Sequence, residues 1–89
     1  MPGDNSTTKA QIKPTGRQLR AARVMAGLTA DQLAKLSGVS LNTIKRAEAL
    51  DGPSSLMPAN LRAITQALRD KGVVFCERDE HGGEGVRLV

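Results

Sequence analysis

The residues best suited to binding chemistry are grouped in one short segment, where Asn42, Lys45 and Arg46 follow the tripeptide Gly38-Val39-Ser40. An amide and two cations on one short helical pattern can donate several hydrogen bonds to an anionic or polar partner. Taken alone, such residues are more often ordinary solvent-exposed positions of a helix. Their interpretation therefore depends on the elements that hold them and on the charge around them.

The distribution of charge along the chain favours a polyanionic partner. The 89 residues carry a net charge of +4, but residues 1–46 hold eight Lys and Arg against two acidic residues, a net charge of +6. Residues 47–89 hold five basic against seven acidic residues, a net charge of −2. A one-sided basic region is the usual electrostatic footprint of a nucleic-acid-binding protein. From the charge alone, a merely solvated basic surface is an equally good interpretation.

We find no set of residues in the sequence that suits catalysis or metal binding. The one His and the one Cys, His81 and Cys76, are five residues apart and have no third group to orient them. The Gly-rich run 82–85 precedes a strand pattern and not a helix, unlike a phosphate-binding loop. We therefore expect no enzyme activity, no cofactor and no metal site, and we expect Cys76 to be a small apolar residue of a strand.

The composition fits one domain in a reducing compartment. With a single Phe and no Trp or Tyr, the core must be built from Leu, Ile, Val, Ala and Met. A single cysteine cannot form an internal disulfide, and no apolar run approaches the roughly 20 residues that span a bilayer. The first residues lack the apolar centre of a signal peptide. We expect a cytoplasmic protein.

Two capping boxes predict where the first two helices begin. Thr15 with Gln18, and Thr29 with Gln32, have the spacing at which each side chain binds the other residue's backbone N–H. The first helix ends at Gly27, and the residues of its inner face are Leu19, Ala22, Arg23 and Ala26. The second helix ends at Ser37-Gly38, and its apolar contacts are expected from Leu33, Ala34 and Leu36.

Two further helices and a hairpin are predicted beyond Val39, which is expected to be buried. Ser40 caps a helix over about residues 41–50, whose inward residues are Ile44, Ala47 and the adjacent Glu48. Another helix runs over about residues 58–71, with a buried stripe of Leu61, Ile64 and Leu68. Residues 73–89 alternate as apolar, turn and apolar segments, which predicts a β-hairpin. Because an isolated hairpin is marginal in water, it must pack on the helices, pair with another chain, or both.

Two short helices joined by a turn that contains Gly form a helix-turn-helix, whose second helix enters the major groove of DNA. The segment GLTADQLAKLSGVSLNTIKRAE resembles the Xre-type, lambda-repressor-like family of DNA-binding domains. The residues that carry the resemblance, which covers about residues 16–71, are Leu33-Ala34, Gly38-Val39-Ser40, Thr43-Ile44 and Glu48. The resemblance implies a mainly α fold, a lambda-repressor-like bundle of four helices with a helix-turn-helix, followed by the β-hairpin.

The domain boundaries follow from these elements. Residues 1–14 are polar and without periodicity, so we expect a flexible tail in which Lys9 and Lys13 are solvated or touch DNA. Residues 15–72 form the DNA-binding domain. Residues 73–89 form the hairpin, which we expect to be a dimerisation element that pairs by its edge.

The resemblance also assigns roles to single residues. The positions that match the family's base-reading residues are Ser40, Leu41, Asn42, Lys45 and Arg46. Asn42 would pair with adenine, Arg46 or Lys45 with guanine, and Leu41 would pack on a thymine methyl. Thr43 and Gln32 would contact phosphates. Ala30 stands where the family often has a Gln that supports DNA contacts, so that contact is missing here.

The family also pairs an Arg of the first helix with a Glu at the end of the third, and the matching residues are Arg23 and Glu48. Arg23 lies on the apolar face of its helix, where a lone charge would be costly. We therefore expect a structural ion pair. The alternative is an Arg23 that is solvated at the edge of the core.

These features predict a sequence-specific transcriptional regulator, a repressor that binds the major groove of a pseudo-palindromic operator as a homodimer and is nucleoid-associated when bound to DNA. The alternative is an antitoxin-type or other protein-interaction module with the same fold. In that case the hairpin and its acidic turn would bind a partner protein, and DNA binding would be secondary.

Overall fold

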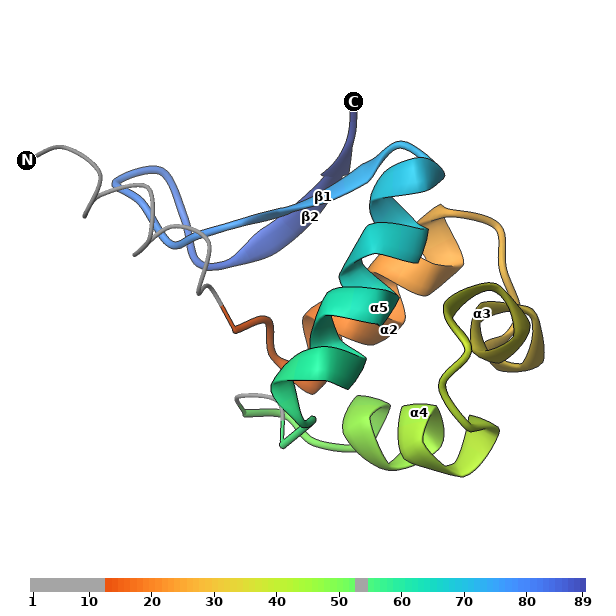
Figure 1. Ribbon diagram of the computed structural model, residues 1–89. Helices are drawn as coiled ribbons and strands as arrows, with labels where there is room; N and C mark the ends of the chain where they lie inside the picture. Colours follow the sequence, from red (N-terminus) through yellow and green to blue (C-terminus); the bar gives the residue numbers. More distant parts are fainter. Residues whose placement is uncertain (1–12, 53–54) are drawn as a thin grey trace, which may run out of the picture.

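The computed structural model describes residues 13–52 and 55–89, which form four helices followed by a two-stranded hairpin (Figure 1). The elements, in chain order, are α2 (Gly16–Met25), α3 (Ala30–Ser37), α4 (Leu41–Glu48), α5 (Pro58–Asp70), β1 (Val73–Cys76) and β2 (Gly85–Leu88). The predicted mainly α fold, with a helix-turn-helix and a C-terminal hairpin, is confirmed. The helix predicted over residues 41–50 is shorter than expected, and the last turn predicted for α5 ends one residue early.

The predicted tail lies mostly outside the described residues, which exclude residues 1–12 and so Lys9. Of its last two residues, Lys13 is exposed, but Pro14 is fully buried. Assigning Pro14 to a flexible tail was therefore wrong. The folded part begins at least one residue earlier than predicted, because the Pro14 ring is packed just before the first turn of α2.

The helix ends follow the local rules that the sequence displays. Thr15 and Thr29 both form complete capping boxes, with Gln18 and Gln32 respectively. Gly38 ends α3 in the left-handed conformation at φ 77°. An L-residue with a side chain rarely adopts this conformation, so the chain reverses here at little cost only because the residue is Gly.

The core is aliphatic, as the composition predicted. Its buried members among the described residues are Leu19, Ala22, Leu33, Val39, Ile44, Ala47, Ile64, Ala67, Leu68 and Val73. Leu36 was predicted to join them, but it is 53% exposed. The inner face of α3 carries Ala30, Leu33 and Ala34, which repeat at helical spacing, and Leu36 lies well to one side of that face.

The hairpin is antiparallel, and it lies across α2 and α5 on the side of the molecule away from α4 (Figure 1). Phe75 and Val86 stand opposite each other in the register and pack against the core. Gln18 fastens the hairpin to α2, because its Nε2 donates to the carbonyl oxygens of Cys76 at 3.3 Å and Gly85 at 2.9 Å. The sequence predicted Gln18 only as a helix cap.

Among the helices of the described residues, we find none with the length and apolar character that crossing a membrane requires.

Candidate nucleic-acid interface

The turn between α3 and α4 fixes the direction in which α4 leaves the core. Val39 is buried between the two helices, and its N–H donates to the Ser37 hydroxyl at 3.2 Å. Ser40 then caps α4, since its hydroxyl accepts from the Thr43 N–H at 3.2 Å and donates to the Thr43 hydroxyl at 2.8 Å. Both ends of the turn are thus held by hydrogen bonds, so α4 has one defined orientation.

The inner side of α4 is buried, whereas its outer side presents polar groups. Ile44 and Ala47 belong to the core. The side chains of Asn42, Lys45 and Arg46 are all exposed. Helical spacing brings them onto one side of α4, since Lys45 and Arg46 follow Asn42 by three and four residues. The structure therefore brings an amide and two cations together on a rigid helix.

The remaining predicted DNA-binding residues surround this cluster. Ser40 is exposed, while Leu41 and Thr43 are half-buried. Gln32 is exposed at the start of α3, where its Oε1 accepts from the Thr29 N–H at 2.9 Å. Within the described part of the chain, its Nε2 makes no hydrogen bond and remains a donor for an external acceptor. The positions of Thr43 and Gln32 are compatible with the phosphate contacts predicted for these two residues.

Arg23 and Glu48 form a two-pronged ion pair that links α2 to the end of α4. The Arg23 Nε lies 2.8 Å from Glu48 Oε2, and its Nη2 lies 3.0 Å from Glu48 Oε1. The third nitrogen, Nη1, donates to the Leu28 carbonyl oxygen at 3.0 Å. The hydrogen bond to Glu48 is the main cause that raises the pKa of Arg23; burial opposes this rise and the negative charge of Glu48 adds to it. The pair thus joins α2, the loop before α3 and α4.

A second contact holds the end of α4 against the start of α2. The backbone at Gly16 approaches the carbonyl oxygens of Ala47 and Leu50 so closely that an added Cβ would overlap both. The Gly16 N–H also donates to the Gly52 carbonyl oxygen at 3.1 Å. Only glycine fits at this position, and sequence reasoning did not identify it.

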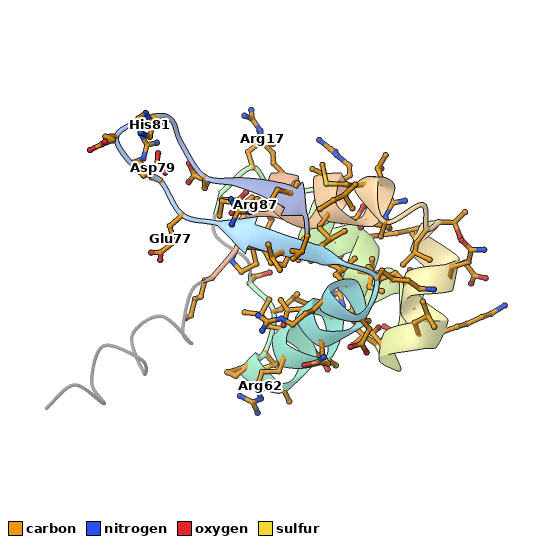
Figure 2. All side chains as sticks on the ribbon, turned by 90° about the horizontal axis from the view of Figure 1, so that it is seen from above. Arg17, Arg62, Glu77, Asp79, His81 and Arg87 are labelled. Atoms are coloured by element: carbon orange, nitrogen blue, oxygen red, sulfur yellow. The ribbon has the colours of Figure 1, made fainter. Side chains whose placement is uncertain are left out.

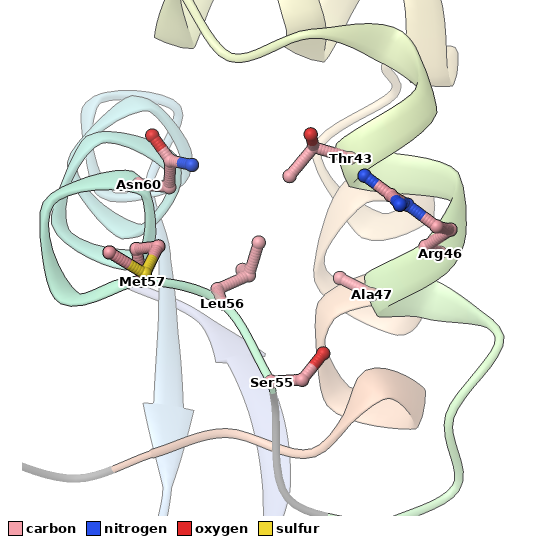
Figure 3. A pocket seen from close by; sticks show the side chains of 7 residues that line it. All are labelled: Thr43, Arg46, Ala47, Ser55, Leu56, Met57 and Asn60. Atoms are coloured by element: carbon pink, nitrogen blue, oxygen red, sulfur yellow. The ribbon is translucent and has the colours of Figure 1, made fainter.

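A hollow of about 330 Å³ separates α4 from the start of α5 (Figure 3). Thr43 and Arg46 line it from α4, and Asn60 faces them from the first turn of α5. Met57, the N-cap of α5, offers no side-chain oxygen to the first N–H groups of that helix. Sequence reasoning did not predict this part of the site. The available signal was Pro58, which marks a helix start, preceded by a residue that cannot cap it.

The other residues considered for chemistry lie apart from this surface. Cys76 is half-buried in β1, and His81 is exposed in the hairpin turn, where its Nε2 lies 3.3 Å from a Glu80 carboxylate oxygen. Among the described residues, we find no group of three or more side chains placed to hold a metal ion.

Comparison with known proteins bears on the same region of the chain. A family model described as a helix-turn-helix domain matches residues 15–69, which include Gln32, Ser40 and the residues of α4 that are predicted to bind DNA. No curated protein matches the chain.

Proposed function

The chain belongs to the helix-turn-helix domain family, and from this premise we propose that it is a sequence-specific transcriptional repressor of the Xre type. It binds a pseudo-palindromic operator as a homodimer. Family membership supports DNA binding and regulation in general. The Xre-type assignment, the repressor role and the dimer are parts of the proposal, as are the absence of enzyme activity and a cytoplasmic location with association to the nucleoid.

The observation that carries the proposal is the division of α4 into a buried side and a side that presents Asn42, Lys45 and Arg46. In a helix-turn-helix protein the second helix lies in the major groove and its N-terminal residues reach the base edges. Asn42 has the donor and acceptor that pair with adenine, while Lys45 and Arg46 have the donors that suit guanine. The half-buried Leu41 offers apolar contact to a thymine methyl group.

Phosphate contacts complete the proposed interface. Thr43 and Gln32 lie beside the cluster, where the first offers a hydroxyl donor and the second an amide donor. Such contacts fix the position of the protein on the duplex but carry no sequence information. Ala30, at the start of α3, has no side-chain donor. The contacts of this region to the DNA phosphates therefore depend on the Gln32 side chain and on the backbone N–H groups of the protein.

The first experiment is selection of duplexes from a random DNA pool by the purified protein at near-physiological salt. Enrichment of a two-fold-symmetric motif supports both specific recognition and a dimer. A single enriched half-site supports recognition alone. Binding that merely fades as salt rises, without enrichment, contradicts the proposal, because it indicates attraction to the backbone only.

Variants make the assignment of residues testable. Asn42→Ala and Arg46→Ala should each weaken binding to the selected sequence by about 1–3 kcal/mol and relax specificity at one base pair. Arg78→Ala is the matched control, since it also removes an arginine but lies in the hairpin turn. If Arg78→Ala weakens binding as much as Arg46→Ala, the role of α4 as the reading helix is wrong.

The interaction-module alternative is tested with the same protein. Replacing Lys45 and Arg46 together with Ala should abolish DNA binding under the proposal. A partner protein that binds the hairpin should still bind this double variant.

A further inference from the structure

Exposed apolar side chains gather along α2 and β2. These elements run side by side, since the Gln18 Nε2 donates to the Gly85 carbonyl oxygen, and Ala21 and Val86 line one hollow of about 160 Å³. One turn beyond Ala21, Val24 is 62% exposed, and two residues beyond Val86, Leu88 is 61% exposed. Ala21, Val24, Val86 and Leu88 thus form an apolar strip along α2 and β2. Its exposed members Val24 and Leu88 are apolar surface that the described residues leave open to water.

The outer edge of β2 is also open, because the sheet of the described residues has only the order β1-β2. The Val89 N–H donates to the Gly72 carbonyl oxygen at 2.8 Å, so Gly72 and Val89 form a hydrogen-bonded pair of the ladder. Hydrogen-bonded and non-hydrogen-bonded pairs alternate in an antiparallel ladder. The backbone N–H and C=O groups of Val86 and Leu88 therefore point outward, toward whatever lies beside β2.

We propose that a second copy of this chain pairs its own β2 with β2, in antiparallel orientation, to give a continuous sheet in the order β1-β2-β2-β1. The inference specifies the partner surface of the proposed dimer and so rests on the proposed function. The second copy satisfies the outward backbone groups and covers Val24 and Leu88. An open strand edge presents a row of N–H and C=O groups with which another strand can pair, and pairing here also removes the neighbouring apolar side chains from water.

Charge determines the register of this pairing. The outward groups of Val86 and Leu88 allow a two-fold axis at Val86 or at Arg87. With the axis at Arg87, the two guanidinium groups would stand directly opposite each other, which is destabilising. With the axis at Val86, each Arg87 stands opposite Gly85 of the second copy, and each Glu84 stands opposite Leu88. We therefore assign the axis to Val86.

Charge complementarity also favours a second copy as the occupant. The hairpin turn is acidic, and Figure 2 shows Glu77 and Asp79 at the end of the hairpin that projects from the helices. The opposite end of the hairpin, where β1 begins, directly follows the exposed residues Arg69 and Lys71. Antiparallel pairing of two hairpins brings the acidic end of each copy toward the basic end of the other. The same surface offers no such match to a copy placed in parallel.

The first test measures the oligomeric state without DNA, by sedimentation equilibrium of the full chain. A monomer–dimer equilibrium is expected, and Leu88→Lys and Val24→Lys should each raise the dissociation constant at least tenfold. Leu36→Lys is the matched control, because Leu36 is similarly exposed but lies on α3. A monomer at every concentration, or a dimer that Leu88→Lys and Val24→Lys leave unchanged, overturns the inference. DNA selection that still enriches a half-site would then leave the proposed recognition standing.

The second test fixes the register by disulfide formation in a Cys76→Ser background. Gly85→Cys mixed with Arg87→Cys should give a cross-linked heterodimer, since residues in that non-hydrogen-bonded pair have Cα atoms about 4.5 Å apart. A Cβ at Gly85 meets no described atom within 4 Å, so the substitution is tolerated. Arg87→Cys that cross-links to itself faster than to Gly85→Cys overturns the register, and the absence of both cross-links overturns the β2 pairing.

Discussion

Replacing Glu48 with Ala should destabilise the fold by about 2–4 kcal/mol. The Glu48 side chain is 9% exposed and accepts two hydrogen bonds from Arg23, whose side chain is 17% exposed. Without the carboxylate, the hydrogen bond to the Leu28 carbonyl oxygen is the one that the guanidinium keeps among the described residues. Removing one partner of a buried ion pair costs about 3–5 kcal/mol, and the partial access of water to Arg23 reduces that cost.

Urea unfolding, followed by circular dichroism, measures this change directly. Thermal unfolding gives a second measure of the same change, since a loss of 1 kcal/mol lowers the melting temperature of a domain this size by about 4–8 °C. Arg23→Met combined with Glu48→Met should cost less than either single replacement by Ala, because no charge is left unpaired near the core. The double-mutant cycle should therefore show strong coupling between the two positions.

Asp51→Ala is the control for this prediction. It removes a carboxylate that lies 3.3 Å from the Arg17 Nε, but both side chains of that pair are at least 70% exposed. An exposed pair contributes about 0–1 kcal/mol. If Glu48→Ala costs no more than Asp51→Ala, the conclusion that the Arg23–Glu48 pair holds α4 against α2 is wrong.

Gly16, Gln18 and Arg23 each allow a further prediction. Gly16→Ala should destabilise the fold by more than 2 kcal/mol in urea unfolding, because the new Cβ would overlap the Ala47 and Leu50 carbonyl oxygens; Gly85→Ala, whose Cβ meets nothing within 4 Å, should have little effect. Gln18→Ala should speed amide hydrogen exchange in β1 and β2 more than in α4, since it removes the two hydrogen bonds that the Gln18 side chain donates to the hairpin. Equal acceleration in α4 would contradict a local role for Gln18. Because the hydrogen bond to Glu48 raises the pKa of Arg23 above its ordinary value, the stabilising charge of Arg23 is fully present below that ordinary value and is lost only as pH rises through the raised pKa. The titration of Arg23 should therefore change the difference in unfolding free energy between the natural protein and Arg23→Met little between about pH 6 and pH 10. A steep fall of this difference within that range would contradict the prediction if it persists when both proteins also carry Glu48→Met.

The parts of the fold that local rules determine could be predicted from the sequence. Thr15 and Gln18 are three residues apart, and Gly38 needs no distant partner to adopt a positive φ. The Arg23–Glu48 contact joins residues 25 positions apart, and the resemblance to a known family was what suggested it. Periodicity alone would have left Arg23 as an unexplained charge on an apolar face.

The parts that depend on long-range packing could not be predicted. The hydrogen bonds of Gln18 to the hairpin join residues 58 and 67 positions apart, and a capping-box pattern contains no information about them. Leu36 was misplaced because an apolar residue near an inner face was counted as part of it. Asn60 escaped notice because α5 approaches α4 only after the chain has folded.

These contacts make α2 the element through which the hairpin and α4 are connected. Near its start, Gln18 binds both strands of the hairpin, while Gly16 lies against the end of α4. One to two turns later, Arg23 binds Glu48 at the end of α4.

If two copies pair through β2, the separation of the two reading helices is therefore set by two rigid α2 helices and not by a flexible linker. Under the proposed function, the operator should tolerate base changes within a half-site, at about 1–3 kcal/mol each, better than a change in half-site spacing. Competition binding with operators lengthened or shortened by one base pair tests this, and equal affinity for all three spacings would show that α2 does not transmit a fixed geometry.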